Sequence, residues 1–250
     1  RDAWRPQYDL VLLGFPMERQ GDPNNFYRHR KQNYISGALN FVSQIGRHHE
    51  LKIGLEARQY TVRYFDISPS VMIYTADTSY SNRRADYPTT YGSMTAVPAK
   101  TWVQNGGVDA FGFDIYGNEI DGEKTYANGV YVEGPKKPLF FSTYVQDKIE
   151  WNDLVINAGL RLDYFDSDDK TLRDPLSPQI DEQSGLVVKS EWVDVDPWVQ
   201  VSPRLGFSFP VTEKTVFYSQ YGKFIQLGQL DQIYFSTWRM SRQIQGGFYY

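Results

Sequence analysis

Apolar and polar residues alternate along several stretches of the chain, most clearly in residues 154–164. Leucine, isoleucine, alanine and tyrosine hold the even positions there, whereas polar residues such as Asn157, Arg161 and Asp163 hold most odd positions. Because successive side chains of a β-strand point to opposite faces, this pattern predicts a strand with one apolar and one polar face. The corner at 151–153 predicts a very short turn to a partner strand.

The same reasoning predicts an all-β chain. Strands are expected at residues 32–45, 50–65, 139–150, 154–165, 198–209, 215–225 and 243–250. Several have about a dozen residues, roughly twice the usual length in soluble proteins and close to what a tilted strand needs to cross a bilayer.

The connections between these strands alternate in length. Short turns fall near Gly46, Asn152 and Thr212, whereas long polar loops occupy 66–138 and 166–197. In an up-and-down sheet the short turns would gather at one end, as they do in outer-membrane barrels. The pattern therefore favours an antiparallel up-and-down transmembrane β-barrel segment with long extracellular loops. A secreted soluble β-sandwich has the same period and remains open as an alternative.

Composition narrows the function classes. The net charge is −4 with both signs mixed, so no basic surface for nucleic acid is expected. Cysteine is absent, which excludes disulfides and a thiolate nucleophile. The three histidines show no metal-ligand spacing, and neither a G-x-S-x-G elbow nor a phosphate-binding glycine loop occurs. We therefore expect no metal, no cofactor and no catalytic residues, and an enzyme is not the expected function.

Polar residues on the water-facing side of the predicted strands are the first candidate site. In a barrel they would face the interior, where a plug or a substrate path lies; alternatively, they pair with neighbours and hold the strand register. These lumen-facing candidates are Lys52, Glu56, Arg58, Asn157, Arg161, Asp163, Gln200 and Arg204.

Aromatic residues of the first long connection are the second candidate site. A connection of this length is usually functional or disordered, and its aromatic content indicates partial order. The aromatic side chains could form an outer ligand platform, or they could pack the loop against itself as a small core. These candidates are Trp102, Phe113, Tyr116, Tyr126 and Tyr131.

Two segments resemble a known family. Residues 144–166, YVQDKIEWNDLVINAGLRLDYFD, resemble a barrel hairpin of TonB-dependent outer-membrane receptors, with a Tyr-x-Gln-Asp strand, a short turn and an Asn-x-Gly-x-Arg-x-Asp strand. Residues 202–226, SPRLGFSFPVTEKTVFYSQYGKFIQ, look like the next hairpin. Together with HELKIGLEARQYTVRYF, the pattern is most similar to the Oar-like branch of that family, and the resemblance spans most of 33–226.

The resemblance implies a 22-stranded barrel with a globular plug, in the outer membrane of a Gram-negative bacterium. Such receptors import a scarce ligand with energy passed from the inner membrane through TonB. Seven strands cannot close that barrel, and no plug or TonB-contacting segment is recognised, so we expect residues 1–250 to be the barrel portion of a longer receptor.

The expected partners follow from that assignment. They are outer-membrane lipid, the TonB complex acting through a plug, an unknown imported ligand, and a surface lipoprotein or complex partner. The alternative function is a barrel whose large loops serve adhesion or surface-complex assembly.

Overall fold

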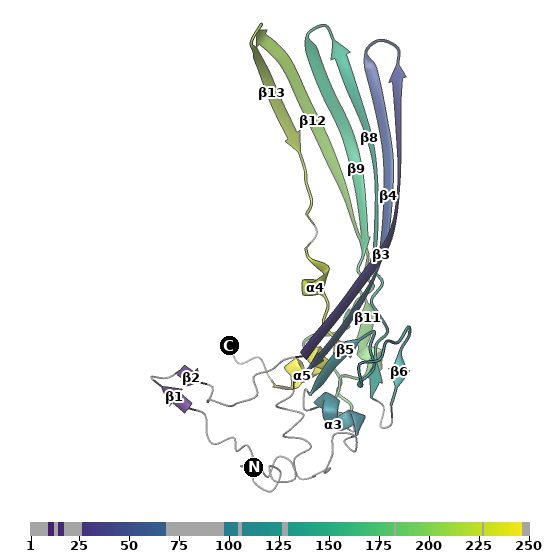
Figure 1. The fold of residues 1–250 in the computed structure, drawn as a ribbon, viewed down its shortest axis with the longest axis vertical. Coiled ribbons are helices and arrows are strands. Elements are labelled where there is room, and N and C mark those ends of the chain that lie inside the picture. The colour runs from purple at the N-terminus through teal and green to yellow at the C-terminus, as the bar shows by residue number, and fades with distance from the viewer. Residues whose placement is uncertain are drawn as a thin grey trace.

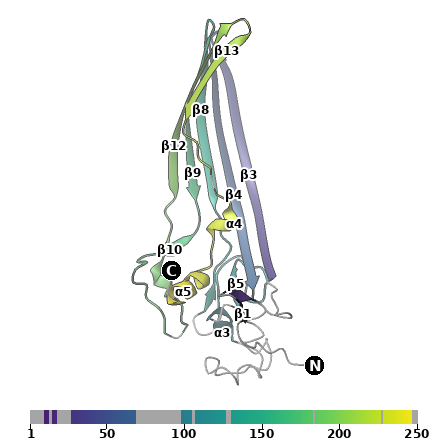
Figure 2. The ribbon, with the colours of Figure 1, turned by 90° about the vertical axis from the view of Figure 1, so that its left-hand side faces the viewer.

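The computed structural model describes residues 10–12, 15–17, 27–68, 98–104, 107–126, 130–182, 184–226 and 228–246. Long strands form one curled sheet, and the connections between them gather into a folded region at one end of it (Figures 1 and 2). We call that region the loop head; it comprises the described residues of 98–138, 167–197 and 230–246.

The elements divide into long strands of the sheet and short elements elsewhere. The long strands are β3 (Tyr27–Ile45), β4 (His49–Ile67), β8 (Leu139–Trp151), β9 (Leu154–Asp166), β12 (Trp198–Thr212) and β13 (Thr215–Gly222). The short strands are β1 (Leu10–Leu12), β2 (Phe15–Met17), β5 (Val108–Phe111), β6 (Lys124–Thr125), β7 (Tyr131–Val132), β10 (Lys170–Leu172) and β11 (Trp192–Asp194). The helices are α3 (Ala99–Gln104), α4 (Leu230–Ile233) and α5 (Thr237–Gly246), with a 3-10 turn at Lys189–Glu191.

Each long strand pairs antiparallel with its neighbours, in the order β13-β12-β9-β8-β4-β3, and β5 extends the sheet beside the end of β4. The turns that join β3 to β4, β8 to β9 and β12 to β13 contain only two or three residues. Figure 1 shows these three hairpin turns together at the top and the loop head at the bottom. The sheet is therefore up-and-down, with its short turns at one end.

The apolar face of the sheet is exposed. Ile35, Leu39 and Phe41 of β3 are 75%, 68% and 60% exposed, and Leu160 of β9 is 54% exposed. Among the described residues, no second layer covers this face. On β3 the apolar positions span 35–45, which matches the roughly 9–11 residues that a tilted strand needs to cross a bilayer.

Polar residues mark the end of this apolar band on the side of the loop head. On the outer face of β3 and β4, Asn33 lies opposite Thr61 and Lys31 lies opposite Arg63. Asp147 is an exception within the outer face, close to the hairpin turns, and its carboxylate lies 2.7 Å from Nδ1 of His49. The polarity of the outer face thus changes along β3 and β4, which have 19 residues each and extend into the loop head.

The strand expected at 243–250 is wrong, and the structure refines two other expectations. Residues 243–246 belong to helix α5, because Ser236 and the buried Trp238 fix the start of that helix in the loop head; residues 247–250 lie outside the described part. Strand β13 ends at Gly222 rather than at 225, since the next partner is Pro203, which has no N–H to continue the ladder. The predicted loops 66–138 and 166–197 contain short strands and a helix, and β4 continues to Ile67.

One hydrophobic core holds the loop head together. It combines Trp102 of α3 and Phe113 from the first long connection, Leu186 from the second and Trp238 of α5 from the third with Phe65 near the end of β4. Three connections that are far apart in the sequence therefore share one buried centre.

Candidate functional site

Cross-strand register places all eight polar candidates on one face of the sheet. In an antiparallel pair, residues directly opposite each other point to the same side. The register joins them in five rows across the strands. These rows are Lys52–Gln146–Gly159–Arg204, Glu56–Ser142–Asp163–Gln200, Arg58–Phe140–Phe165–Trp198 and Lys148–Asn157–Gly206, with Arg161 opposite Tyr144 and Ser202. We call this side, opposite to the exposed apolar band, the inner face.

Most charges of the inner face pair along a strand rather than across strands. The guanidinium of Arg58 lies 2.8 Å from Glu56, and that of Arg161 lies 2.8 Å from Asp163. Lys52 is paired in the same way with Glu50 at 2.8 Å. Residues two apart on a strand point to the same side, so these pairs neutralise the face locally.

A hollow of about 480 Å³ opens on the inner face toward the loop head. It is bordered by β4, β8, β9, β12 and the segment after β13. Its lining includes Glu56, Arg58, Arg161, Asp163, Ser202, Arg204, Lys223 and Phe224. A smaller hollow of about 290 Å³ lies nearer the hairpin turns, where Asn157 and Arg204 contribute to the wall. Five of the eight candidates thus line the larger hollow, and Arg204 borders both; Lys52 and Gln200 line neither.

Helix α4 closes the inner face at the loop head. Leu230 and Tyr234 pack with Val62 of β4 and Phe111 of β5 in a second apolar cluster. The ring of Phe140 stacks on that of Phe165 at 4.5 Å next to this cluster. The hollow therefore has an aromatic end toward the loop head and a charged wall toward the hairpin turns.

The loop aromatics do not form an outer platform. Trp102 and Phe113 are 3% and 1% exposed in the core of the loop head, and Tyr131 is buried as well. Tyr126 is half-buried, with its hydroxyl accepting from the N–H of Ile115 at 3.2 Å. Only Tyr116 is exposed to solvent, at 66%. Most of these residues instead belong to a small core that packs the loops together. Burying a large apolar ring lowers the free energy, whereas leaving it exposed to water does not.

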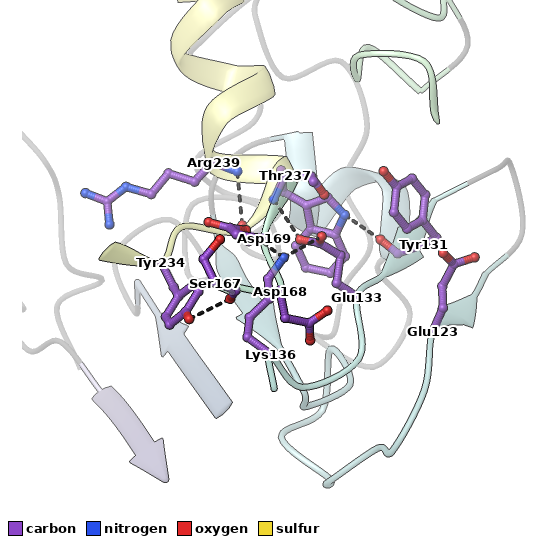
Figure 3. A network of polar contacts seen from close by, with 12 residues as sticks. Glu123, Tyr131, Glu133, Lys136, Ser167, Asp168, Asp169, Tyr234, Thr237 and Arg239 are labelled. Carbon is purple, nitrogen blue, oxygen red and sulfur yellow. Dashed lines mark hydrogen bonds and ion pairs between the residues drawn. The ribbon is translucent and has the colours of Figure 1, made fainter. Parts of the chain in front are cut away.

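A buried charge network joins the three connections, as Figure 3 shows. The amine of Lys136, in the first connection, lies 3.0 Å from Glu133 and 2.9 Å from Asp169 of the second connection. Burial alone would lower the pKa of Lys136, but the two carboxylates outweigh it and raise that pKa. Burial raises the pKa of Asp169. The amine therefore stays charged between its two partners.

The same network anchors helix α5. The second carboxylate oxygen of Glu133 accepts from the N–H of Thr237 at 3.0 Å, and the hydroxyl of Ser236 accepts from the N–H of Arg239 at 3.1 Å (Figure 3). These bonds satisfy N–H groups that the first turn of a helix leaves without partners. The indole N–H of Trp238 donates to the carbonyl of Tyr131 at 2.5 Å.

Sequence reasoning missed this network. The side chains of Glu133, Lys136 and Asp169 belong to common charged residues in polar loops, and no spacing marks them. The only indication of a buried cation in the sequence is that Lys136 lies between two prolines and close to aromatic residues, and this indication is weak.

Within the described residues, no group of three or more histidine, aspartate or glutamate side chains could hold a metal ion. None of the helices in that part of the chain is long and apolar enough to cross a membrane.

The geometry of the sheet defines a class of protein. Long antiparallel strands with an exposed apolar band, a charged inner face and short turns at one end form the wall of an outer-membrane β-barrel. Residues 3–250 match the family described as TonB dependent receptor-like, beta-barrel. The chain belongs to this family, which is an outer-membrane class of receptors that works with TonB-type machinery. Neither the curated proteins nor the solved structures include a match to this chain.

Proposed function

We propose that this chain forms the barrel wall and the ligand-facing loops of a receptor that imports a scarce ligand. The observation that carries the proposal is the division of the strands into two faces. The outer face is apolar and exposed over a membrane-spanning length, and the inner face holds a charged hollow of about 480 Å³. Binding without chemical conversion of the ligand is the proposed activity, so the chain is not proposed to be an enzyme.

The finer assignment rests on the motifs and on the sheet edges. In the described residues β3 pairs only with β4, and β13 only with β12. Unpaired edges are unfavourable in lipid, and we propose that both edges pair with further strands of a 22-stranded barrel that encloses a plug. The hairpin motifs support placement in the Oar-like branch, in the outer membrane of a Gram-negative bacterium.

The direction of the receptor follows from its connections. Outer-membrane barrels have short periplasmic turns and longer extracellular loops. The loop head is accordingly proposed to be extracellular, where it meets the ligand, and the three hairpin turns are proposed to be periplasmic.

Accessibility of single cysteines in whole cells tests the orientation. Residues 1–250 contain no cysteine, so Tyr116→Cys in the loop head and Asp153→Cys in the β8–β9 turn each add one thiol to the full receptor, and the unmodified receptor is the control for thiols elsewhere. Both positions are exposed. A bulky polyethylene-glycol maleimide that does not pass the outer membrane should modify the first variant and not the second. Modification of Asp153→Cys alone would reverse the assignment.

Uptake separates import from adhesion. Cells that produce the receptor would be offered labelled ferric siderophore, oligosaccharide, oligopeptide and cobalamin, with and without TonB. Receptor-dependent uptake of one probe that disappears without TonB supports the proposal. Attachment of cells to a surface, with no uptake of any probe, would favour the adhesion alternative.

A further inference from the structure

Among the described residues, two cations that line the larger hollow have no carboxylate partner: Arg204 and Lys223. Arg58 and Arg161, which line the same hollow, are each paired with a carboxylate at 2.8 Å. No carboxylate of the described residues lies within ion-pair distance of Arg204, whose guanidinium instead lies 5.1 Å from the ring centre of Phe224. Stacking on a ring leaves the N–H groups at the edge of a guanidinium able to donate.

Two further donors lie next to Arg204. Ser202 precedes it by two residues on β12, so both side chains point to the inner face; Ser202 is 2% exposed, and its hydroxyl has no hydrogen-bond partner among the described residues. Arg161 lies directly opposite Ser202 and uses only Nε in its pair with Asp163. Its terminal nitrogens have no partner in the described part of the chain.

We propose that Arg204, Ser202 and Arg161 form an anion subsite that binds a carboxylate or phosphate group of the imported ligand. The planar guanidinium of arginine matches both anions through two parallel hydrogen bonds. All three residues belong to the lining of the larger hollow. The inference rests on the proposed function and adds the chemical class of the ligand.

The surroundings of the subsite define the rest of that class. Phe224 covers Arg204, and Phe140, Phe165 and Trp198 line the hollow on the side of the loop head. Aromatic walls beside a cation favour a ligand that carries an apolar or aromatic part next to its anionic group. The ligand class is thus an amphipathic anion rather than a neutral sugar.

Weak-binding probes test the subsite in the purified full receptor. The probe is 4-fluorobenzoate, observed by broadening of its fluorine resonance, and 4-fluorobenzamide is its neutral counterpart. We expect fluorobenzoate to bind, fluorobenzamide to bind more weakly, and Arg204→Gln to weaken fluorobenzoate binding by about tenfold or more. Ser202→Ala should weaken it less, and Arg204→Lys should retain part of the affinity.

Lys148→Gln is the matched control. Lys148 is also an inner-face cation, but it is paired with Glu150 at 2.5 Å and borders neither hollow. Equal loss in Lys148→Gln and Arg204→Gln would reduce the effect to overall charge and overturn the subsite. Equal binding of the two probes would overturn it as well, and so would absence of fluorobenzoate binding to the unmodified receptor, which would mean that an acidic group of the receptor itself occupies Arg204.

The outcome is separable from that of the import proposal. If Arg204→Gln does not fold, Arg204→Lys and Ser202→Ala still decide the case, because both retain the shape of the wall. TonB-dependent uptake of a neutral probe together with no preference for fluorobenzoate would leave import standing and remove only the anion subsite.

Discussion

Replacing Lys136 by methionine should open the loop head while leaving the membrane sheet intact. The amine of Lys136 is held by Glu133 at 3.0 Å and by Asp169 at 2.9 Å. The side chains of these three residues are only 6%, 9% and 18% exposed. Methionine keeps the apolar stem but removes the charge, so two carboxylates are left in a buried space without their cation.

The expected cost follows from this burial. Removing one partner of a buried ion pair typically destabilises by about 3–5 kcal/mol, because the remaining charge stays desolvated. Glu133 also accepts from the N–H of Thr237, so the start of helix α5 should loosen together with the network. Lys189 provides a matched control: its amine lies 2.7 Å from Glu123, but the two side chains are 59% and 35% exposed. An exposed pair of this kind contributes less than about 1 kcal/mol.

Hydrogen exchange followed by mass spectrometry measures the effect region by region in the detergent-solubilised receptor. In Lys136→Met, peptides that cover 131–138, 167–172 and 236–246 should exchange faster, and peptides of β8 and β9 should not change. Lys189→Met should resemble the unmodified receptor. Equal exchange in the two variants, or acceleration spread evenly into the sheet, would refute the view that Lys136 joins the connections.

Three further predictions concern the sheet and the loop head. A Cβ on Gly54 would lie 2.2 Å from the ring of Tyr144, so Gly54→Ala should destabilise the barrel by about 1–3 kcal/mol. The barrel should then unfold at a lower temperature, as measured by the heat-dependent shift of its migration in a gel. Gly37 has open space around it, so Gly37→Ala should change this temperature little. Leu160→Arg places a charge on the lipid-facing side and should lower the free energy of urea unfolding by about 2–4 kcal/mol for a position near the bilayer centre. Leu176 in the second connection is 96% exposed, so Leu176→Arg should leave this free energy unchanged. Burial raises the pKa of Tyr131 from 10.0 to about 12, so the stability that its neutral form contributes is complete below pH 10 and is lost as the pH rises toward 12. In Tyr131→Phe, the fall in unfolding free energy over this pH range should be smaller by about 2–3 kcal/mol, measured by unfolding at each pH.

The two faces of the sheet could be predicted because strand alternation is a local property. Each of Lys52, Arg161 and Arg204 shares a parity with its polar neighbours, and the register of the sheet preserves that parity across strands. Apolar residues therefore pair with apolar residues on one face, and polar residues pair with polar residues on the other. A slip of one residue in the strand register would move every side chain of that strand to the opposite face.

The loop head could not be predicted because its contacts are non-local. Trp102 and Trp238 share a core although most of the chain lies between them, and each lies in a helix that period-two reasoning does not detect. Lys136 meets Asp169 only after the first two connections fold against each other. For the same reason, an aromatic residue such as Phe113 could not be assigned to a core or to a surface from its neighbours in the chain.

A shared core makes the three connections a single structural unit. Exchanging one of them for the corresponding loop of a related receptor would remove one wall of that core and expose the remainder. Engineering of new ligand preference in this receptor should therefore transplant all three connections at once, or alter only side chains that lie on the outside, such as Tyr116.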